Sequence, residues 1–276
     1  MSKKDLVSVI VTTKNEQDVI GRLITSLKKQ SYQNIEIILV DNFSQDQTVK
    51  IAKKEKVVVY QYGPERSAQR NFGAKVSKGN FLFFLDADME LTDGVINEAV
   101  KKIKVNPQIG GIIIPEVSKA ENFWGQVKAF ERSFYNLSGD EYTDAARFFK
   151  RELIKRVGGY DETITGPEDW DLPERIKKLG FKIERIKTVI YHYERISSPY
   201  QLARKKYYYG LKSSRYLSKN KISAIGPKTI YLLRPVFYKN WKKLLSNPGL
   251  SIAMFFLLTV EQIAGGLGYI RGLLDE

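Results

Sequence analysis

The chain contains no cysteine and only one histidine among its 276 residues. Without cysteine, a disulfide framework, a thiolate metal site and a thiol nucleophile are all impossible, and the composition fits a reducing compartment. The first residues enter a strand pattern directly and show no apolar core of a signal peptide. We therefore expect the catalytic part of the chain to stay in the cytoplasm.

Acidic residues are missing from one long stretch. Between Ile196 and Val260 the chain carries twelve lysine and arginine residues and no aspartate or glutamate, whereas residues 1–195 hold 32 basic and 28 acidic residues. Most of the formal net charge of +14 therefore belongs to the C-terminal part. The composition changes near Ser197 to Pro199, which predicts a domain of residues 1–197 and a basic, aromatic-rich helical module of residues 198–276.

Apolar runs of strand length alternate with helical patterns in the first ninety residues. The expected strands are Leu6–Val11, Ile35–Val40, Val57–Tyr60 and Phe81–Leu85, and a helix is expected over Ser67–Val76. This order predicts right-handed βαβ units, and so an α/β fold around a mostly parallel sheet. We assign residues 1–90 to a nucleotide-binding half and residues 91–197 to an acceptor half.

The later pattern is less regular. It predicts a helix at 94–105, a strand over Ile109–Val117, a helix turn closed by paired glycines at Gly158 and Gly159, a helix from Glu168 toward Lys178, and one or two strands within Phe181–Tyr191. We find no internal repeat and no low-complexity linker.

The C-terminal module reads as helices, the first over Tyr200–Tyr216. Residues 248–270 are strongly apolar, but Glu261 and Gln262 interrupt them, and a spanning helix needs about 20 mainly apolar residues. Interleaved aromatic and basic residues beside a short apolar helix favour peripheral or monotopic attachment at the cytoplasmic face of the cell membrane. Basic residues near a membrane are attracted to anionic lipid.

Two carboxylates close the apolar run of Phe81–Leu85. Asp86 and Asp88 stand at the C-terminal mouth of a buried strand, where open α/β sheets place ligands. Oxygen ligands there can hold Mg²⁺ or Mn²⁺ bound to phosphates. The alternative is an ordinary turn, because aspartate after a strand is common turn chemistry.

Five segments in this order resemble the family 2 glycosyltransferases with the GT-A fold: Val9–Glu16, the Asp41 segment, Arg70–Gly73, the Asp86/Asp88 pair and Glu168–Asp171. The resemblance covers about residues 5–195 and implies inverting transfer of a sugar from a nucleoside-diphosphate donor with a divalent cation. The first loop carries Thr12-Thr13 where many members have proline, and the second carries Asp41-Asn42 where many have paired acids. The donor base and sugar stay open.

The donor side of the expected site is drawn from three loops and a helix. Asp41 follows the second strand and is expected to bind base or ribose, while Thr12, Asn15 and Glu16 line the nucleoside pocket. Asp41 and Asn15 have an alternative role as helix caps. Arg70 is expected to pair with the diphosphate, unless it is a solvated helix arginine. Asp88 is the expected metal ligand, and Asp86 acts through the ribose or a water.

The resemblance places the catalytic base at Asp169, which would deprotonate an acceptor hydroxyl. Glu168 would orient the base or contact the acceptor, and Trp170 would form an apolar wall for a sugar. The simpler role of these acids is to stabilise a helix N-terminus. His192 lies where similar enzymes place a histidine near the metal or diphosphate, which makes it a candidate metal ligand, although a lone histidine is more often structural. Arg195 is a candidate phosphate contact.

The leading hypothesis is an inverting glycosyltransferase that uses a UDP- or GDP-sugar and a lipid-linked or cell-surface glycan acceptor. If the acceptor is itself a phosphate, as in a polyprenyl-phosphate sugar synthase, Asp169 matters less. A nucleic-acid-binding protein could use the basic, tyrosine-rich C-terminus, but nucleic acid does not explain the apolar segment, and we expect none to bind. A sugar nucleotidyltransferase needs a glycine-rich loop, and Thr12–Ile20 has no glycine.

Overall fold

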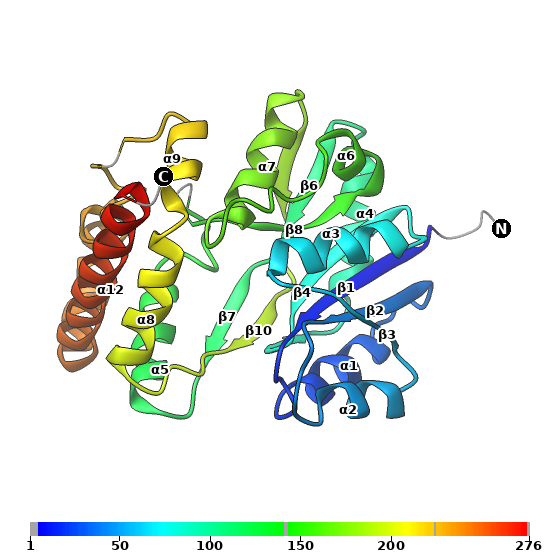
Figure 1. The fold of residues 1–276 in the computed structure, drawn as a ribbon, viewed down its shortest axis with the longest axis horizontal. Coiled ribbons are helices and arrows are strands. Elements are labelled where there is room, and N and C mark those ends of the chain that lie inside the picture. The colour runs from blue at the N-terminus through cyan, green and yellow to red at the C-terminus, as the bar shows by residue number, and fades with distance from the viewer. Residues whose placement is uncertain (1–4, 141–142, 224, 275–276) are drawn as a thin grey trace. The chain divides into compact units, whose positions relative to one another are not determined.

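The computed structural model describes residues 5–140, 143–223 and 225–274, and these form two compact units. The first unit consists of residues 1–116, 145–162 and 168–192 and is built on a seven-stranded sheet with the order β3-β2-β1-β4-β8-β6-β9 (Figure 1). The second unit consists of residues 117–144, 163–167 and 193–276. Residues 1–197, which the sequence predicts to be one domain, therefore contribute to both units.

The nucleotide-binding half contains the four expected strands: β1 (Val7–Thr13), β2 (Ile35–Asp41), β3 (Val58–Gln61) and β4 (Phe81–Asp86). All pairings among them are parallel, and β1 lies between β2 and β4. The connecting helices are α1 (Ile20–Lys28), α2 (Thr48–Lys54) and α3 (Arg66–Val76). The predicted βαβ order is confirmed, with boundaries that differ by one or two residues.

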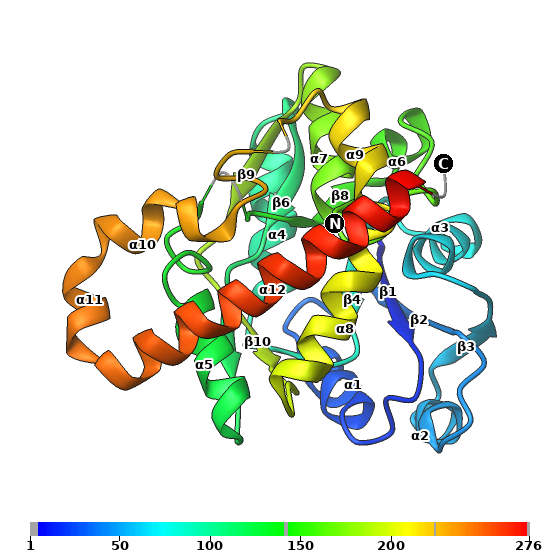
Figure 2. The same cartoon turned by 60° about the vertical axis from the view of Figure 1, so that its left-hand side comes forward.

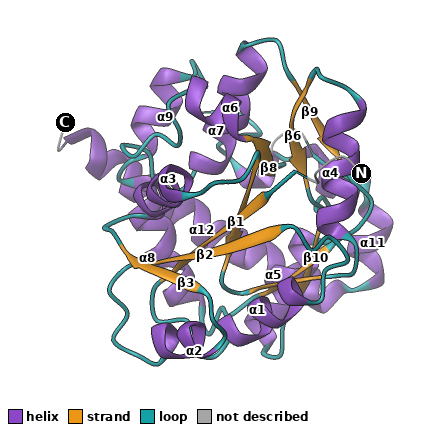
Figure 3. Cartoon of the chain, turned by 90° about the vertical axis from the view of Figure 1, so that its right-hand side faces the viewer, coloured by secondary structure: helices purple, strands orange, loops and turns teal. Residues whose placement is uncertain are grey.

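Helices cover both faces of this sheet, which explains why its strands read as continuous apolar runs. All seven residues of β1 are buried. Val9 packs into a core with α1 and α4 (Val95–Val105), whereas Ile10 packs with α6 (Arg151–Arg156) and α7 (Glu168–Lys178) on the other side. Figure 3 shows α3 on one side of the sheet and α1 and α2 on the other.

The second half of the sheet has mixed direction. Strand β8 (Ala146–Lys150) runs antiparallel to both β4 and β6 (Ile109–Ile113), and β9 (Lys182–Arg185) runs parallel to β6. A smaller sheet has the order β5-β10-β7, with bounds Met89–Leu91, Ile190–Tyr193 and Glu116–Lys119. The single strand expected over Ile109–Val117 was wrong, because Ile114 and Pro115 separate β6 from β7.

Glycines allow close packing of α3 against the strands and the α6–α7 connection. Gly158 and Gly159 both have φ near +78° and end α6, as the sequence predicts. A Cβ at Gly159 would lie 2.4 Å from Asn71 Oδ1, and Asn71 bonds both the N–H and the C=O of Tyr160. Asn71 on α3 thus fixes the turn that carries Tyr160.

The second unit is helical. It contains α5 (Phe123–Arg132), α8 (Pro199–Gly210), α9 (Ser213–Lys219), α10 (Pro235–Lys239), α11 (Trp241–Ser246) and α12 (Pro248–Leu274), with a short 3₁₀ turn at Tyr231–Leu233. Figures 1 and 2 both show α12 running alongside α8. The one helix expected over Tyr200–Tyr216 is divided into α8 and α9. The apolar segments around Glu261 form one unbroken helix.

Two helical glycines provide a matched test of this packing. A Cβ at Gly73 in α3 would lie 2.5 Å from Ile10 Cγ2 in β1, whereas a Cβ at Gly21 in α1 would make an ordinary contact of 3.8 Å with Ile51. We expect Gly73→Ala to lower the free energy of unfolding by about 1–3 kcal/mol through overpacking, and Gly21→Ala to raise it by up to about 1 kcal/mol through helix propensity. Urea unfolding measures both, and equal effects of the two variants would contradict the packing described.

Candidate active site

The expected donor residues gather at the carboxyl edge of the parallel strands. Thr12 is the register partner of Asp86, and Thr13 is the partner of Asp41. The first two loops are tied together there: the backbone N–H of Asn15 donates to Ser44 Oγ (2.8 Å), and Asn15 Oδ1 accepts from the backbone N–H of Gln45 (2.8 Å). The backbone N–H of Glu16 donates to Thr48 Oγ1 (2.7 Å).

Asp41 and Asn15 are not helix caps. Asp41 is fully buried and accepts hydrogen bonds from Thr13 Oγ1 (3.0 Å) and from the backbone N–H of Ser44 (2.8 Å), and the cap position of α2 belongs to Gln47. Asn15 has φ of +56°, and the cap position of α1 belongs to Val19. Both side chains therefore shape the loops that would surround a nucleoside, and their contact with a nucleotide stays a prediction.

Arg70 is a buried bridge between carboxylates. Its side chain is 1% exposed, and its guanidinium lies 3.1 Å from Asp86 Oδ1 and 2.6 Å from Asp169 Oδ1. It also lies over the ring of Tyr160, 5.0 Å from the centroid. The alternative of a solvated helix arginine was wrong. In the structure Arg70 holds Asp86 and Asp169, and its contact with a diphosphate stays a prediction.

A second buried arginine holds Asp86 from another strand. Arg147 Nη1 on β8 lies 3.4 Å from Asp86 Oδ2, and its Nη2 lies 2.8 Å from Glu116 Oε1. Burial alone would raise the pKa of Asp86, but the Arg70 and Arg147 guanidiniums outweigh burial and hold that pKa far below its usual range. Asp86 is therefore ionised throughout the neutral range.

The lone histidine belongs to the same group of side chains. His192 on β10 is brought to Met89 of β5 by strand pairing, and its Nε2 lies 3.4 Å from Asp88 Oδ2. Its Nδ1 lies 2.9 Å from Glu116 Oε2. The structure thus places the expected metal ligands Asp88 and His192 next to each other, although they are far apart in sequence.

This donor set fits a divalent cation that is completed by a substrate. Across residues 5–140, 143–223 and 225–274, no group of three acidic or histidine side chains is arranged to hold a metal ion. Asp88 and His192 would supply one carboxylate oxygen and one imidazole nitrogen. Mg²⁺ in phosphate-binding sites is commonly held by one or two carboxylates together with phosphate oxygens, so two protein ligands suit a diphosphate-bound cation.

The acidic pair at the start of α7 divides into a buried and an accessible member. The side chain of Glu168 is 1% exposed and lies 3.0 Å from Arg66, whereas that of Asp169 is 23% exposed. Burial raises the pKa of Glu168 despite the nearby arginine. Trp170 follows on the same helix and is partly buried. The accessible member is the one that the resemblance places as the base.

Arg195, the expected phosphate contact, is exposed and belongs to the second unit, in the segment that follows β10. Its contact with a phosphate stays a prediction.

The sequence analysis missed Glu116, Arg147, Tyr160 and Arg66. Two of them carry a visible pattern: Glu116 ends an apolar run in the same way as Asp86, and Arg147 lies between the apolar residues Ala146 and Phe148 of β8. A charge that must be buried on a strand needs a partner, and that requirement marks a polar site.

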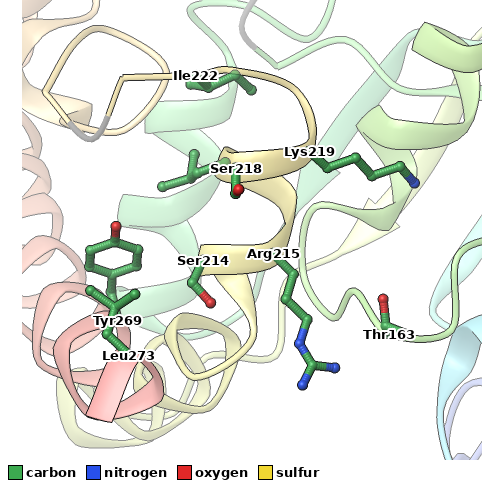
Figure 4. Close-up of a pocket in the computed structure, with 9 residues that line it drawn as sticks. Thr163, Ser214, Arg215, Ser218, Lys219, Ile222, Tyr269 and Leu273 are labelled. Carbon is green, nitrogen blue, oxygen red and sulfur yellow. The ribbon is translucent and has the colours of Figure 1, made fainter. Parts of the chain in front are cut away.

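The second unit has a groove of its own, with a volume of about 660 Å³. Figure 4 shows Ser214 and Ser218 on α9, with Tyr269 and Leu273 of α12 to one side and the side chains of Arg215 and Lys219 to the other. Thr163, Leu217 and Ile222 complete the lining. The groove combines two cations, several hydroxyl groups and an apolar wall.

Helix α12 is long and apolar enough to cross a membrane, by length and composition only, and 33% of its most apolar window is buried within the protein. Glu261 faces inward: its carboxylate lies 2.6 Å from Lys128 and 2.7 Å from Lys206. Burial would raise its pKa, but these two cations hold the pKa at about 2. The opposite face exposes an apolar stripe made of Ile252, Phe256, Ile263, Leu267, Ile270 and Leu274.

The sheet order and the polar group at its carboxyl edge are typical of α/β enzymes that bind a phosphate-bearing nucleotide. Comparison with known families agrees. The model described as glycosyl transferase family 2 matches residues 8–158, more than half of the chain, and the model described as N-terminal domain of galactosyltransferase matches residues 125–199. The chain belongs to glycosyltransferase family 2.

Curated relatives match over part of their length. An uncharacterized glycosyltransferase of Haemophilus influenzae is 26% identical over 178 residues, which are 60% of this chain and 60% of the relative. WfaP of Escherichia coli, a UDP-Glc:alpha-D-GlcNAc-diphosphoundecaprenol beta-1,3-glucosyltransferase, is 36% identical over 89 residues, 30% of this chain and 36% of that protein. The chain thus spans 60% or less of the length of these relatives.

Solved structures show the same GT-A fold. The mannosyltransferase PcManGT from Pyrobaculum calidifontis, in complex with GDP-Man and Mn²⁺, has a TM-score of 0.65 at 17% identity and covers 100% of this chain and 89% of its own. Staphylococcus aureus TarS residues 1–349, in complex with UDP-GlcNAc, has a TM-score of 0.54 at 17% identity, covering 98% of this chain and 91% of its own. The predicted fold class is confirmed.

The low pKa of Asp86 makes the stability of the first unit depend on pH. Because the pKa is lower in the folded than in the unfolded chain, ionised Asp86 stabilises the fold above the usual carboxyl pKa of about 4, and this contribution is lost as the pH falls. Asp86→Asn removes the negative charge that Arg70 and Arg147 share. We therefore expect it to lower the free energy of unfolding at pH 7 by about 3–5 kcal/mol.

We also expect the difference in thermal midpoint between wild type and Asp86→Asn to begin to shrink as the pH falls below about 4, the usual carboxyl range, and to go on shrinking toward the much lower pKa of folded Asp86. The exposed Asp93 offers a matched control: Asp93→Asn should stay close to wild type throughout. A difference for Asp86→Asn that stays constant with pH would contradict the ion-pair assignment.

Proposed function

We propose that this glycosyltransferase transfers a sugar, with inversion, from a UDP- or GDP-sugar to a lipid-linked acceptor at a membrane surface. The observation that carries the proposal is the group formed by Asp86, Asp88, His192 and Asp169 at the carboxyl edge of the sheet. It combines two ligands for a phosphate-bound cation with an accessible carboxylate on α7.

Departure of the nucleotide is the first requirement of the reaction. Asp88 and His192 would hold Mn²⁺ or Mg²⁺, which when bound neutralises the diphosphate charge that develops as the sugar–phosphate bond breaks. PcManGT was solved with GDP-Man and Mn²⁺, which supports a divalent cation here. Arg70 and Arg147 keep Asp86 ionised beside this position, ready to accept a hydrogen bond from the ribose or a bound water.

The acceptor hydroxyl needs a base on the opposite side of the sugar. Asp169 suits this role because its carboxylate is partly exposed, whereas Glu168 is buried with Arg66. In the absence of substrate Asp169 is paired with Arg70, so the acceptor must approach its second oxygen or displace that contact. Glu168 would then orient the start of α7, and Trp170 would contact the acceptor.

Three observations favour a lipid-linked acceptor. The stripe on α12 is apolar and exposed. The groove beside α9 combines Arg215 and Lys219 with apolar side chains, which suits a phosphate attached to a lipid chain. WfaP acts on a sugar carried by diphosphoundecaprenol. Because Glu261 ties the other face of α12 to lysines of its own unit, we propose that the helix lies on the membrane rather than across it.

One test concerns the donor. Purified protein incubated with UDP-, GDP- and dTDP-sugars, Mn²⁺ and a membrane-lipid extract should release nucleoside diphosphate from one donor. Asp88→Ala should reduce this release by at least about 100-fold, since loss of a single electrostatic contact to developing negative charge already costs about 10²–10³ in rate. Release that persists in Asp88→Ala or in excess EDTA would overturn the metal-dependent mechanism.

Asp169→Asn tests the chemical nature of the acceptor. For a hydroxyl acceptor the loss of a general base should lower kcat by about 10²–10⁴-fold, whereas a phosphate acceptor is already ionised and should keep much of the rate. Hydrolysis of the donor by water serves as the reference reaction. Full activity of Asp169→Asn on a hydroxyl acceptor would remove Asp169 from the mechanism.

Substitutions in the exposed apolar stripe of α12 test membrane binding. We expect Leu267→Glu or Ile263→Glu to weaken binding to anionic vesicles by at least about tenfold, because each removes an exposed apolar side chain whose burial in the membrane would be worth about 1.5–3 kcal/mol. Val105→Glu is the matched control, since Val105 is 81% exposed on α4 of the first unit. Retention on single-stranded DNA without binding to vesicles would support the nucleic-acid alternative instead.

A further inference from the structure

Glu116 occupies a position that neither the sequence analysis nor the comparisons assign. It lies at the start of β7, and its two carboxylate oxygens have different partners. Oε2 lies 2.9 Å from His192 Nδ1, and Oε1 lies 2.8 Å from both Nε and Nη2 of Arg147. The guanidinium edge of Arg147 therefore holds one oxygen while the other faces the imidazole.

The chemistry of these groups fixes the proton on the ring. An ionised carboxylate only accepts hydrogen bonds, and a neutral imidazole carries one hydrogen. Both ring nitrogens face a carboxylate, but Nδ1 lies 2.9 Å from Glu116 whereas Nε2 lies 3.4 Å from Asp88, so the closer contact places the hydrogen on Nδ1. Nδ1 of His192 is then the donor, and in the neutral ring the lone pair is on Nε2. Nε2 is the nitrogen that lies 3.4 Å from Asp88 Oδ2, the carboxylate proposed to share the cation.

We propose that Glu116 is a positioning residue that fixes the Nδ1–H tautomer and the ring orientation of His192, and that Arg147 fixes Glu116 in turn. The inference rests on the proposed function to the extent that His192 is a metal ligand. A carboxylate behind a ligating histidine raises the basicity of the ligand and prevents ring rotation, and loss of such a partner typically costs 10–100-fold in metal affinity.

The isosteric variant Glu116→Gln separates this role from a packing role. The guanidinium of Arg147 has only donors, so it should donate to the amide oxygen of the new glutamine side chain. The amide NH₂ then faces His192 Nδ1, which must become an acceptor, and the proton moves to Nε2. The size of the side chain and the number of its hydrogen bonds are retained. Nε2 of His192, however, now carries a hydrogen and has no lone pair for the cation. An analogous carboxylate-to-amide change is known to impose the wrong tautomer in a serine protease triad.

The single histidine makes the tautomer directly observable. In protein labelled with ¹⁵N-histidine, at a pH high enough to keep the ring neutral, two-dimensional NMR distinguishes the protonated from the unprotonated ring nitrogen. We expect Nδ1–H in the wild type and Nε2–H in Glu116→Gln. Glu184→Gln is the matched control, since Glu184 is a half-exposed carboxylate of β9 paired with Lys102, and it should give the wild-type spectrum.

Affinity for Mn²⁺ alone, measured by EPR from the loss of the free-ion signal, completes the test. We expect Glu116→Gln to weaken binding by about 10–100-fold, and to cause no further loss in a His192→Ala background, because its effect passes through the ring. An Nε2–H ring in the wild type, or an unchanged tautomer in Glu116→Gln, would overturn the proposal. An additive loss in the double variant would also overturn it.

Failure of the proposed function looks different. If Asp88→Asn and His192→Ala both leave Mn²⁺ affinity unchanged, the cation site itself is wrong, whatever the tautomer. If Asp88→Asn and His192→Ala weaken binding but Glu116→Gln does not, only the role of Glu116 is wrong.

Discussion

Asp86 between two buried arginines is the interaction on which the site depends. Arg70 comes from α3 and Arg147 from β8, so one carboxylate joins a helix of the nucleotide-binding half to a strand of the other half. Taking three charges out of water is costly unless each is paired. The arrangement is therefore poor evidence for added stability, and its value lies in holding charged groups in one geometry.

From Asp86 the contacts extend in two directions. Arg70 continues to Asp169 on α7, and Arg147 continues through Glu116 to His192 and Asp88. The proposed base and the proposed metal ligands are thus ends of one chain of hydrogen bonds and ion pairs. Groups held in this way need little rearrangement when charge develops in a reaction, which is the main source of electrostatic catalysis.

Most strands and helices of the fold could be predicted from the sequence, because their hydrophobic periods are local. Asp86, Asp88 and Asp169 could be predicted as site residues because they lie at the ends of regular elements. Arg70 was found, but its partners were not, because its contact with Asp169 joins residues 99 positions apart. Glu116 was hidden inside a strand expected to continue to Val117. The inward turn of Glu261 was also missed, since a charge within an apolar run looks like an interruption until Lys128 and Lys206 are seen beside it.

The path of the chain has a consequence for evolution and for engineering. The backbone changes unit at residues 116, 144, 162, 167 and 192. The core of the second unit combines Val127 of α5 and Phe134, which follows α5, with Leu202 of α8 and Met254 of α12. No single cut yields two complete hydrophobic cores. The helical unit therefore cannot be separated by removing one end of the chain. A chimera that exchanges only residues 198–276 would build the hydrophobic core of this unit partly from one parent sequence and partly from the other.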